Sequence, residues 1–556
     1  MGEDESFELS FSFDKLKKSV YFHEIIYAFL FLIVLFSFLN SYGGNTFVHE
    51  SPYQFLAGDM FWLTSESEGI KSTNDVLNRP FFLSAGRTDI YNAFPLGLPT
   101  ATAEVSFFTG HETFDSLFHL NFFFIIMSMV FVYFLLRKIS IPVAMFGTPL
   151  ALLFLKWPFS YPVNFGAQMS TMNMFTVFGS AVAFLYLKER WMFIVLGLLN
   201  GIGFYAHGRE SLMFNLIVVL FFGYQILKKQ FDLDVFKKYC MSVGVTIISM
   251  WPILPIYLKT LDVHEIDFSF LQFCPASPAS SHPIFFSHFG ILQWLIFAGI
   301  GLSAVTAFTK KLDFEKSFVF LLGFGFLFNS YFCVLGNKTT QIRHFFPLTL
   351  ALFFGYALYV LYSQIPESKS KGSLLLIIAG VVLVFVYLNY NPGSIAEYPV
   401  SNPYTWDAIQ WSQNNIPDNN TLLFMYGDNH YQYTLFFLSK KIHSSIEQKD
   451  YYATIQSKKI TPYFPVIDGS LGYLFVRTSF FDVRYDGILF MKNISLCDYD
   501  YVLYNKQSQN QLVQQYTNAV GSLLVTESGF TPAYQNDLVV ILKNNGGACF
   551  AERTFA

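Results

Sequence analysis

Long apolar stretches follow one another through the first 390 residues of this sequence, and they restrict what the chain can fold into. Each is about 17–22 residues long, enough for an α-helix to cross roughly 30 Å of hydrocarbon. Isolated strands would leave backbone groups unpaired in lipid, so we predict about eleven transmembrane helices. The predicted spans are Tyr21–Leu39, Ser116–Leu136, Ile139–Leu155, Met169–Leu187, Trp191–Ala206, Leu212–Leu227, Cys240–Tyr257, Phe289–Phe308, Phe318–Leu335, Phe345–Tyr362 and Leu374–Tyr390.

Composition agrees with a membrane protein. Of the 556 residues, 53% are hydrophobic and only 13% are charged, which is more apolar than one soluble core requires. A net charge of −4 provides no basic field, so we expect no nucleic-acid partner. The sequence also shows no phosphate-binding loop after a strand, no Ser-His-Asp spacing and no dinucleotide fingerprint.

Lysine and arginine set the predicted orientation, because cytoplasmic connections are enriched in them. With the N-terminus inside, every inner connection carries at least two positive residues, and the outer short loops hold about half as many. We therefore predict a multi-pass plasma (inner) membrane protein, or an ER membrane protein in a eukaryote, with a cytoplasmic N-terminus. The chain after about Asn391 is then extracytoplasmic.

Two domains are expected. Residues 1–390 are predicted to form a transmembrane module with a long first outer loop at about 40–114, and residues 391–556 a soluble, extracytoplasmic α/β domain. The predicted elements of this domain are a helix at Tyr404–Asn415 and strands at Thr421–Tyr426, Gly472–Val476, Tyr501–Tyr504 and Leu538–Leu542. Cys497 and Cys549 fall in this domain, where they either form a disulfide or remain two free thiols.

Asp59 in the first outer loop is the main candidate for catalysis. Ser51 and Pro52 are a good helix start, and on that helix Asp59 would lie in the centre of an apolar face. An unpaired carboxylate there is costly, and a catalytic role would explain it. In the alternative interpretation, Asp59 is solvated in the headgroup region. Its predicted neighbours are Phe55, Leu56, Trp62 and Leu63.

Cations cluster at two other outer positions. Arg209, between two predicted spans and near a helix start, is suited to binding phosphate. It could equally pair with Glu210 and extend to the membrane surface. Arg343 and His344 precede a later span, and ordinary anchoring at the interface would explain them as well.

Several short segments together resemble the GT-C superfamily of membrane glycosyltransferases. The likeness is greatest to the branch that contains protein O-mannosyltransferases and the aminoarabinose transferase of lipid A. Two departures from that pattern are Met60, where the family has a second acid, and the missing first Pro of a Tyr-Pro-Pro-Gly-like segment. The segments that carry the resemblance are Gly58–Asp59, Tyr91–Gly97, Phe107–Gly110, His207–Glu210, Arg343–Pro347 and Trp406–Pro417.

The resemblance implies transfer of a sugar from a polyprenyl-phosphate donor to a lipid, glycan or protein acceptor on the extracytoplasmic face. Asp59 would be the general base of an inverting, single displacement, which needs no enzyme nucleophile. The residues implied for the donor phosphate are Arg209, Arg343 and His344, and those implied to line the site are Tyr91, Asn92, His207 and Glu210.

No cofactor is indicated with certainty. Glu66 and Glu68 lie near Asp59 in the sequence and could join a divalent-metal site, so metal dependence is open. Two other functions are considered: a flippase or exporter of lipid-linked glycans, and a catalytically silent GT-C-like scaffold in envelope glycan assembly. A flippase would need a polar path across the membrane, which the predicted spans lack.

Overall fold

The structure of the chain is a computed structural model. The residues that it describes are 20–42, 48–52, 58–76, 80–83, 96–151, 168–254, 290–332, 346–367, 370–388, 402–427, 435–457, 463–467, 491–506, 511–526 and 529–546.

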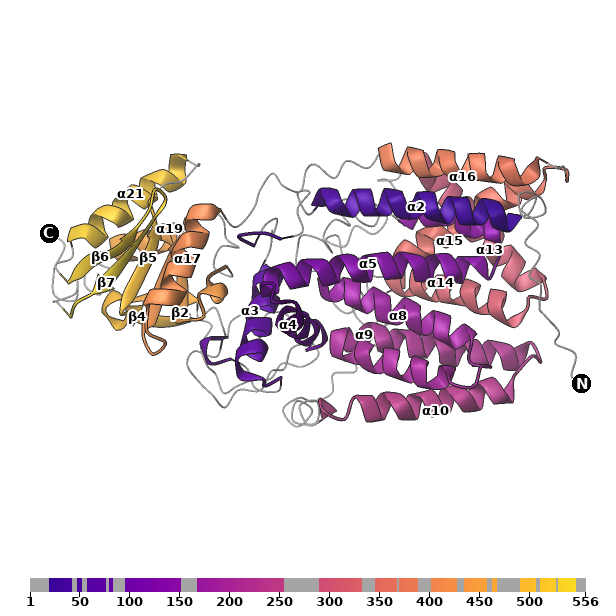
Figure 1. Cartoon of the computed structure of the whole chain (residues 1–556), viewed down its shortest axis with the longest axis horizontal. Coiled ribbons are helices and arrows are strands. Elements are labelled where there is room, and N and C mark those ends of the chain that lie inside the picture. The colour runs from indigo at the N-terminus through magenta and orange to yellow at the C-terminus, as the bar shows by residue number, and fades with distance from the viewer. Residues whose placement is uncertain are drawn as a thin grey trace, which may run out of the picture.

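The chain forms a bundle of long helices and, beyond one end of that bundle, a sheet flanked by helices (Figure 1). Apolar side chains from most of the long helices form one continuous core in the bundle. The bundle helices are α2 (Val20–Tyr42), α5 (Thr113–Arg137), α6 (Ile141–Ala151), α8 (Gln168–Leu185), α9 (Met192–Leu227), α10 (Leu233–Ser249), α13 (Leu292–Thr309), α14 (Phe314–Phe332), α15 (Phe346–Ser363) and α16 (Lys371–Leu388).

Every predicted span overlaps one of these helices, and α9 covers two of them. Among the described residues, four helices are long and apolar enough to cross a membrane: α5, the second half of α9 at Glu210–Leu227, α13 and α16. Five further helices in this part of the chain are apolar but shorter. The predicted class, a mostly helical polytopic membrane protein with a C-terminal α/β part, is therefore confirmed, while the number of crossings stays a prediction.

Helix α10 begins earlier than predicted. The apolar pattern placed a span at Cys240–Tyr257, but the helix runs from Leu233 to Ser249. Its start is fixed by Asp232, whose side chain accepts hydrogen bonds from the backbone N–H groups of Asp234 and Val235. The first turn of α10 is charged, so hydropathy did not include it in the predicted span. The helix start depends on the capping carboxylate of Asp232 and not on apolar residues.

Helix α9 is broken at the position where a turn was predicted. His207 has an extended backbone (φ −169°, ψ 100°), while the residues on both sides are helical. We predicted a turn at Ala206–Ser211 between two spans. In the structure, only His207 departs from helical geometry there. The second half of α9 starts at once, with Arg209 and Glu210 in its first turn.

Two helices, α3 (Gly58–Thr73) and α4 (Gly97–Thr109), lie at the end of the bundle that faces the sheet (Figure 1). Pro52, the predicted first helical residue, is not helical, residues 53–57 lie outside the described residues, and α3 is described from Gly58 onward. The backbone of Asp59 is helical, as predicted.

The α/β part contains a seven-stranded sheet in the order β4-β3-β2-β1-β5-β7-β6. β1 is central and pairs in parallel with β2 and β5, and the other pairs are antiparallel. The strands are β1 (Thr421–Tyr426), β2 (Ile442–Glu447), β3 (Tyr463–Ile467), β4 (Met491–Ser495), β5 (Tyr501–Asn505), β6 (Phe530–Gln535) and β7 (Val539–Asn544). The other elements are the helices α17 (Pro403–Asn415), α19 (Gln448–Ser457) and α21 (Gln511–Thr526) and the short 3₁₀ segments η1 (Phe81–Leu83), η6 (Phe436–Ser439) and η7 (Leu496–Asp498).

Most predicted elements of this part are confirmed. α17, β1, β5 and β7 match the predicted helix and three of the predicted strands, and Asn402 caps α17 by accepting from the N–H of Thr405. The predicted strand at Gly472–Val476 lies outside the described residues. Cys497 is disulfide-bonded. Cys549, its proposed partner, lies outside the described residues.

Candidate active site at the end of the bundle

Helix α3 carries Asp59 and is deeply buried along its middle. Met60 to Leu63 have no exposed surface, and neither do Thr64 to Ser67. The hydroxyls of Thr64, Ser65 and Ser67 are satisfied within the helix, because each donates to the carbonyl four residues earlier, at 2.7, 2.8 and 2.7 Å. The backbone of Asp59 is therefore held by a buried helix, while its side chain lies outside the described residues.

Glu68 anchors α3 on two sides. The hydroxyl of Thr113, at the start of α5, donates to Oε1 of Glu68 at 2.7 Å, and Lys440 donates to Oε2 at 2.7 Å. Burial alone would raise the pKa of Glu68, but the charge of Lys440 and the hydrogen bonds from Lys440 and Thr113 outweigh it and lower that pKa. Glu68 is thus an ionised group with both oxygens occupied by protein donors.

A second connection joins α3 to α4. Lys71 donates to the hydroxyl of Ser106 at 2.9 Å, and that hydroxyl donates to the carbonyl of His111 at 2.6 Å. The last turn of α3 is thereby linked to α4 and to the segment that leads into α5. The three helices form one unit across the end of the bundle.

Gly97, the last residue of the Tyr91–Gly97 segment, begins α4 at the break in α9. A β-carbon at Gly97 would come within 3.0 Å of the backbone nitrogen of Ala206 and of the backbone carbon of Tyr205. Glycine therefore allows a close approach that any larger residue would have to widen by displacing backbone. Leu98 and Ala206 also share a hydrophobic cluster with Met60 to Leu63, so segments far apart in the sequence gather at one place.

The break in α9 is held by an interaction between His207 and Glu210. Nδ1 of His207 forms a hydrogen bond with Oε2 of Glu210, whose side chain is fully buried, while that of His207 is 24% exposed. Arg209 is in the same turn, but its side chain lies outside the described residues, as do all of Tyr91, Asn92, Arg343 and His344. The structure thus brings together the segments that carry Asp59, Gly97, His207 and Glu210.

The predicted metal ligands are both on α3. Glu66 is fully buried, and Glu68 is held by Thr113 and Lys440 as described above. Within the described ranges, no three side chains of His, Cys, Asp or Glu are grouped so that they could hold a metal ion.

A histidine–aspartate pair at this end of the bundle was missed by the sequence analysis. The backbone N–H of His49 donates to both carboxylate oxygens of Asp115, at 3.2 and 3.1 Å, and Nδ1 of His49 lies 2.7 Å from Oδ1. Both side chains are buried. The pair holds His49 against the first turn of α5, and its 66-residue separation leaves no local signal in the sequence.

The α/β part packs directly on this unit. The indole N–H of Trp406, on α17, donates to the carbonyl of Glu50 at 2.9 Å, and its ring meets Phe114 edge-on with centroids 5.7 Å apart. Phe436 and Phe437 of η6 belong to the same hydrophobic cluster as Met60 to Leu63. Helix α3 is thus packed between the bundle and the α/β part.

Comparison with known proteins finds similarity at the level of structure. No protein-family model matches the sequence, and no curated protein matches it by sequence. Among solved structures, the apo oligosaccharyltransferase of Archaeoglobus fulgidus superimposes with a TM-score of 0.54 at 11% identity, over 91% of this chain and 73% of that one.

Two further structures are similar. ArnT from Cupriavidus metallidurans bound to undecaprenyl phosphate has a TM-score of 0.53 at 12% identity, over 94% of this chain and 98% of ArnT. The arabinofuranosyltransferase AftD from Mycobacteria has a TM-score of 0.53 at 10% identity, over 94% of this chain but only 42% of AftD. At these identities the similarity establishes the fold.

Proposed function

We propose that this chain, which has the fold of the GT-C glycosyltransferases, is a membrane glycosyltransferase that uses a sugar donor linked to a polyprenyl phosphate. The observation that carries the proposal is the convergence of the Asp59 helix, Gly97 and the His207–Glu210 break at one end of the bundle. Of the solved structures above, ArnT is bound to undecaprenyl phosphate, a lipid of the proposed donor class.

In the proposed reaction, a hydroxyl or amine of the acceptor attacks the anomeric carbon of the donor sugar. The bond from that carbon to the phosphate oxygen breaks, and the lipid phosphate leaves with the electron pair. Asp59 takes the proton from the acceptor, and one displacement inverts the anomeric centre. A phosphate is already a good leaving group, so a separate acid catalyst is unnecessary.

Cations are proposed to stabilise the charge that develops on the phosphate. The first candidate is Arg209, in the first turn of the second half of α9. Its guanidinium would bind the donor phosphate together with N–H groups at the start of that helix segment. Arg343 and His344 are proposed as further phosphate contacts, and Tyr91 and Asn92 as residues that line the acceptor side. Glu210 and His207 are proposed to position the turn that carries Arg209.

The site is proposed to face the extracytoplasmic side, together with the α/β part. The distribution of lysine and arginine supports this orientation. The disulfide at Cys497 supports it as well, because disulfides persist in oxidising compartments. The division into a catalytic module at 1–390 and a soluble domain at 391–556 is part of the same proposal, although the two parts share the cluster around Trp406 and Phe436.

The decisive experiment measures transfer from a lipid-linked sugar by the purified full-length protein. Asp59→Asn and Asp59→Ala should reduce turnover by at least about a hundredfold. This is the low end of the usual effect of losing a general base. Glu104→Gln, which changes an exposed carboxylate on α4, is the matched control and should behave like wild type. Turnover near wild type in both Asp59 variants would remove Asp59 from the mechanism.

Two additional measurements separate the alternatives. Arg209→Ala should raise the donor concentration needed for half-maximal rate, and an unchanged donor dependence would argue against phosphate binding there. Addition of a chelator tests metal dependence. A flippase would move labelled lipid across liposomes without forming a glycosidic bond, and a silent scaffold would keep its cellular role in the Asp59 variants.

A further inference from the structure

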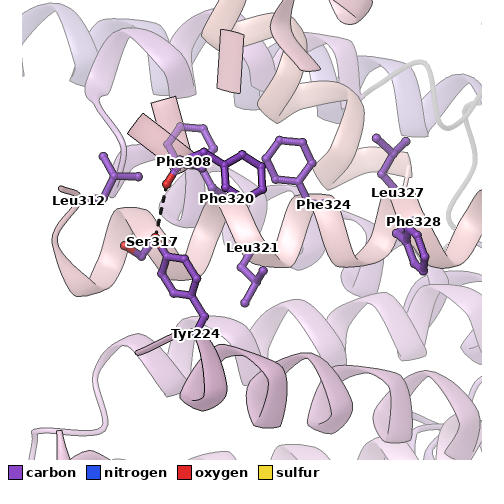
Figure 2. A pocket seen from close by; sticks show the side chains of 10 residues that line it. Tyr224, Phe308, Leu312, Ser317, Phe320, Leu321, Phe324, Leu327 and Phe328 are labelled. Carbon is purple, nitrogen blue, oxygen red and sulfur yellow. Dashed lines mark hydrogen bonds between the residues drawn. The ribbon is translucent and has the colours of Figure 1, made fainter. Parts of the chain in front are cut away.

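A cavity of about 440 Å³ lies between α9, α13 and α14, away from the candidate active site (Figure 2). Its wall includes Tyr224 of α9, Phe308 of α13, and Phe320 and Phe324 of α14. Tyr224 is about 20 Å beyond Glu210 along the second half of α9, at about 1.5 Å per residue. The cavity therefore belongs to the opposite end of the bundle from Asp59.

The interior of this cavity is almost entirely apolar, and it opens toward the surface of the bundle. Phe308 is 77% exposed and Phe328 49% exposed, so its edge is formed by aromatic side chains on the outside of the helices. A volume of this size is in the usual range for a small-molecule site. Apolar walls that open on a lipid-facing surface suit a hydrocarbon chain better than a water-soluble compound.

Within the described residues, one polar group in the wall has no hydrogen-bond partner. Ser317, in the first turn of α14, is 4% exposed, and its hydroxyl has no hydrogen-bond partner among the described residues. By contrast, the hydroxyl of Tyr224 donates to the carbonyl of Ala307 at 3.4 Å (Figure 2). Because a buried hydroxyl without a partner is costly, Ser317 indicates a ligand that brings an acceptor oxygen.

Three lysines lie next to lining residues at this end of the cavity, one by contact and two by sequence. The ammonium of Lys228 lies 5.7 Å from the centre of the Tyr224 ring, and Lys310 and Lys311 stand between the lining residues Phe308 and Leu312 in the sequence. Within the described part of the chain, none of these three lysines forms an ion pair with a carboxylate.

The nearby acids are already neutralised by other lysines. Asp313 pairs with Lys316 at 3.0 Å, and Glu315 pairs with Lys138 at 2.9 Å. Lys228, Lys310 and Lys311, which flank lining residues, therefore leave this end of the bundle with positive charge that an anionic headgroup would match.

We infer that this cavity binds an anionic phospholipid of the leaflet at the lysine-rich end of the bundle. One acyl chain occupies the apolar interior, and the phosphate lies among Lys228, Lys310 and Lys311. The Ser317 hydroxyl donates to an oxygen of the headgroup or of the ester. This site is independent of the sugar-transfer chemistry proposed above, since it uses none of the same residues.

The test is lipid titration of the delipidated full-length protein, followed by native mass spectrometry. Phosphatidylglycerol and phosphatidylcholine with identical acyl chains are compared on wild type and on the triple variant Lys228→Ala/Lys310→Ala/Lys311→Ala. Wild type should prefer phosphatidylglycerol, and the triple variant should lose at least about tenfold in affinity for it, given the contribution of each lysine near an anionic headgroup. The matched control replaces Arg190, Lys237 and Lys543, three exposed cations away from the cavity, by alanine and should keep the preference.

A second variant tests the apolar interior separately. Leu321→Trp should fill the cavity and weaken both lipids, while the melting temperature shows whether the fold is kept. Equal binding of the two lipids to wild type, with no change in the triple variant, would overturn the inference. A polyprenyl phosphate that binds here and displaces phosphatidylglycerol would also overturn it, because the occupant would then be the donor lipid.

Discussion

The ammonium of Lys440 lies 2.7 Å from the carboxylate of Glu68, although the two residues are 372 positions apart in the sequence. Lys440 follows η6 in the α/β part, and Glu68 is on the helix that carries Asp59. The backbone of Lys440 is left-handed, with φ 56°, a conformation that non-glycine residues rarely adopt. The ion pair thus connects the sheet to the helix of the candidate base.

We predict that Lys440→Met destabilises the contact between the α/β part and α3. The loss should be about 1 kcal/mol, below the range of about 1.5–3 kcal/mol for a charged hydrogen bond, because Lys440 is 39% exposed and partly screened. Hydrogen exchange should become faster in α3, and turnover should fall if α3 holds the base. Lys449→Met breaks an exposed pair with Glu447 and serves as control. Unchanged exchange in α3 would show that the pair does not hold this helix.

The sequence predicted the helical part well because burial in lipid requires long apolar stretches. Hydropathy is a property of each residue, so such stretches can be recognised without knowing any long-range contact. It also indicated β1 and β5, whose side chains are almost all buried. β2, with the sequence IHSSIE, and β6, with FTPAYQ and mostly exposed residues, lack a continuous apolar pattern. Their pairing with β1 and β7 is what makes them strands.

The candidate site was only partly predictable. The apolar residues Trp62 and Leu63 beside Asp59 marked a buried helix, and the polar turn at His207 marked the break in α9. The contacts that position these elements join residues far apart in the sequence, such as Glu68 with Lys440. Such pairs leave no local periodicity, so only the folded chain reveals them.

Buried His443 should make the stability of the α/β part depend on pH. Burial lowers the pKa of His443 to about 4, from an ordinary value of 6.5, although its hydrogen bond to the carbonyl of Lys441 opposes this. Between pH 6.5 and 4 the unfolded chain binds a proton that the folded chain does not, so stability falls as the pH drops through this window.

The expected loss across that window is about 3 kcal/mol for a shift of this size. His443→Phe should fit between Phe424 and Phe437, which contact the imidazole, and should remove most of this dependence. The check is the thermal unfolding midpoint of the full-length chain at pH 7.5 and pH 5, for wild type and variant. An identical pH dependence in both proteins would show that His443 is not responsible.

Gly97→Val should separate α4 from the break in α9. The first added carbon already comes within 3.0 Å of two backbone atoms, which cannot move aside as a side chain can. We expect a loss of about 1–3 kcal/mol, the usual range for overpacking, together with lower turnover. Gly223→Ala, on the second half of α9, meets nothing within 4 Å and is the control. A Gly97→Val protein with normal melting temperature and turnover would contradict the proposed contact.

Glu210 is predicted to be a positioning residue for the donor site. Its carboxylate is fully buried and holds the imidazole of His207, so it fixes the turn whose backbone includes Arg209. Glu210→Gln keeps the size of the side chain and removes its charge, and it should lower turnover about tenfold through small misplacement of the phosphate contacts. Glu189→Gln, an exposed residue just before α9, should have no effect.

The kinetic pattern distinguishes positioning from a general loss of folding. If Glu210 acts through the turn, Glu210→Gln should raise the KM for the lipid-linked donor while the KM for the acceptor and the melting temperature stay near wild type. Arg209→Ala should raise the same donor KM. If the double variant Arg209→Ala/Glu210→Gln shows no further increase, the two residues act together on the donor. Fully additive losses would mean that Glu210 acts independently of Arg209, and the proposed role would be wrong.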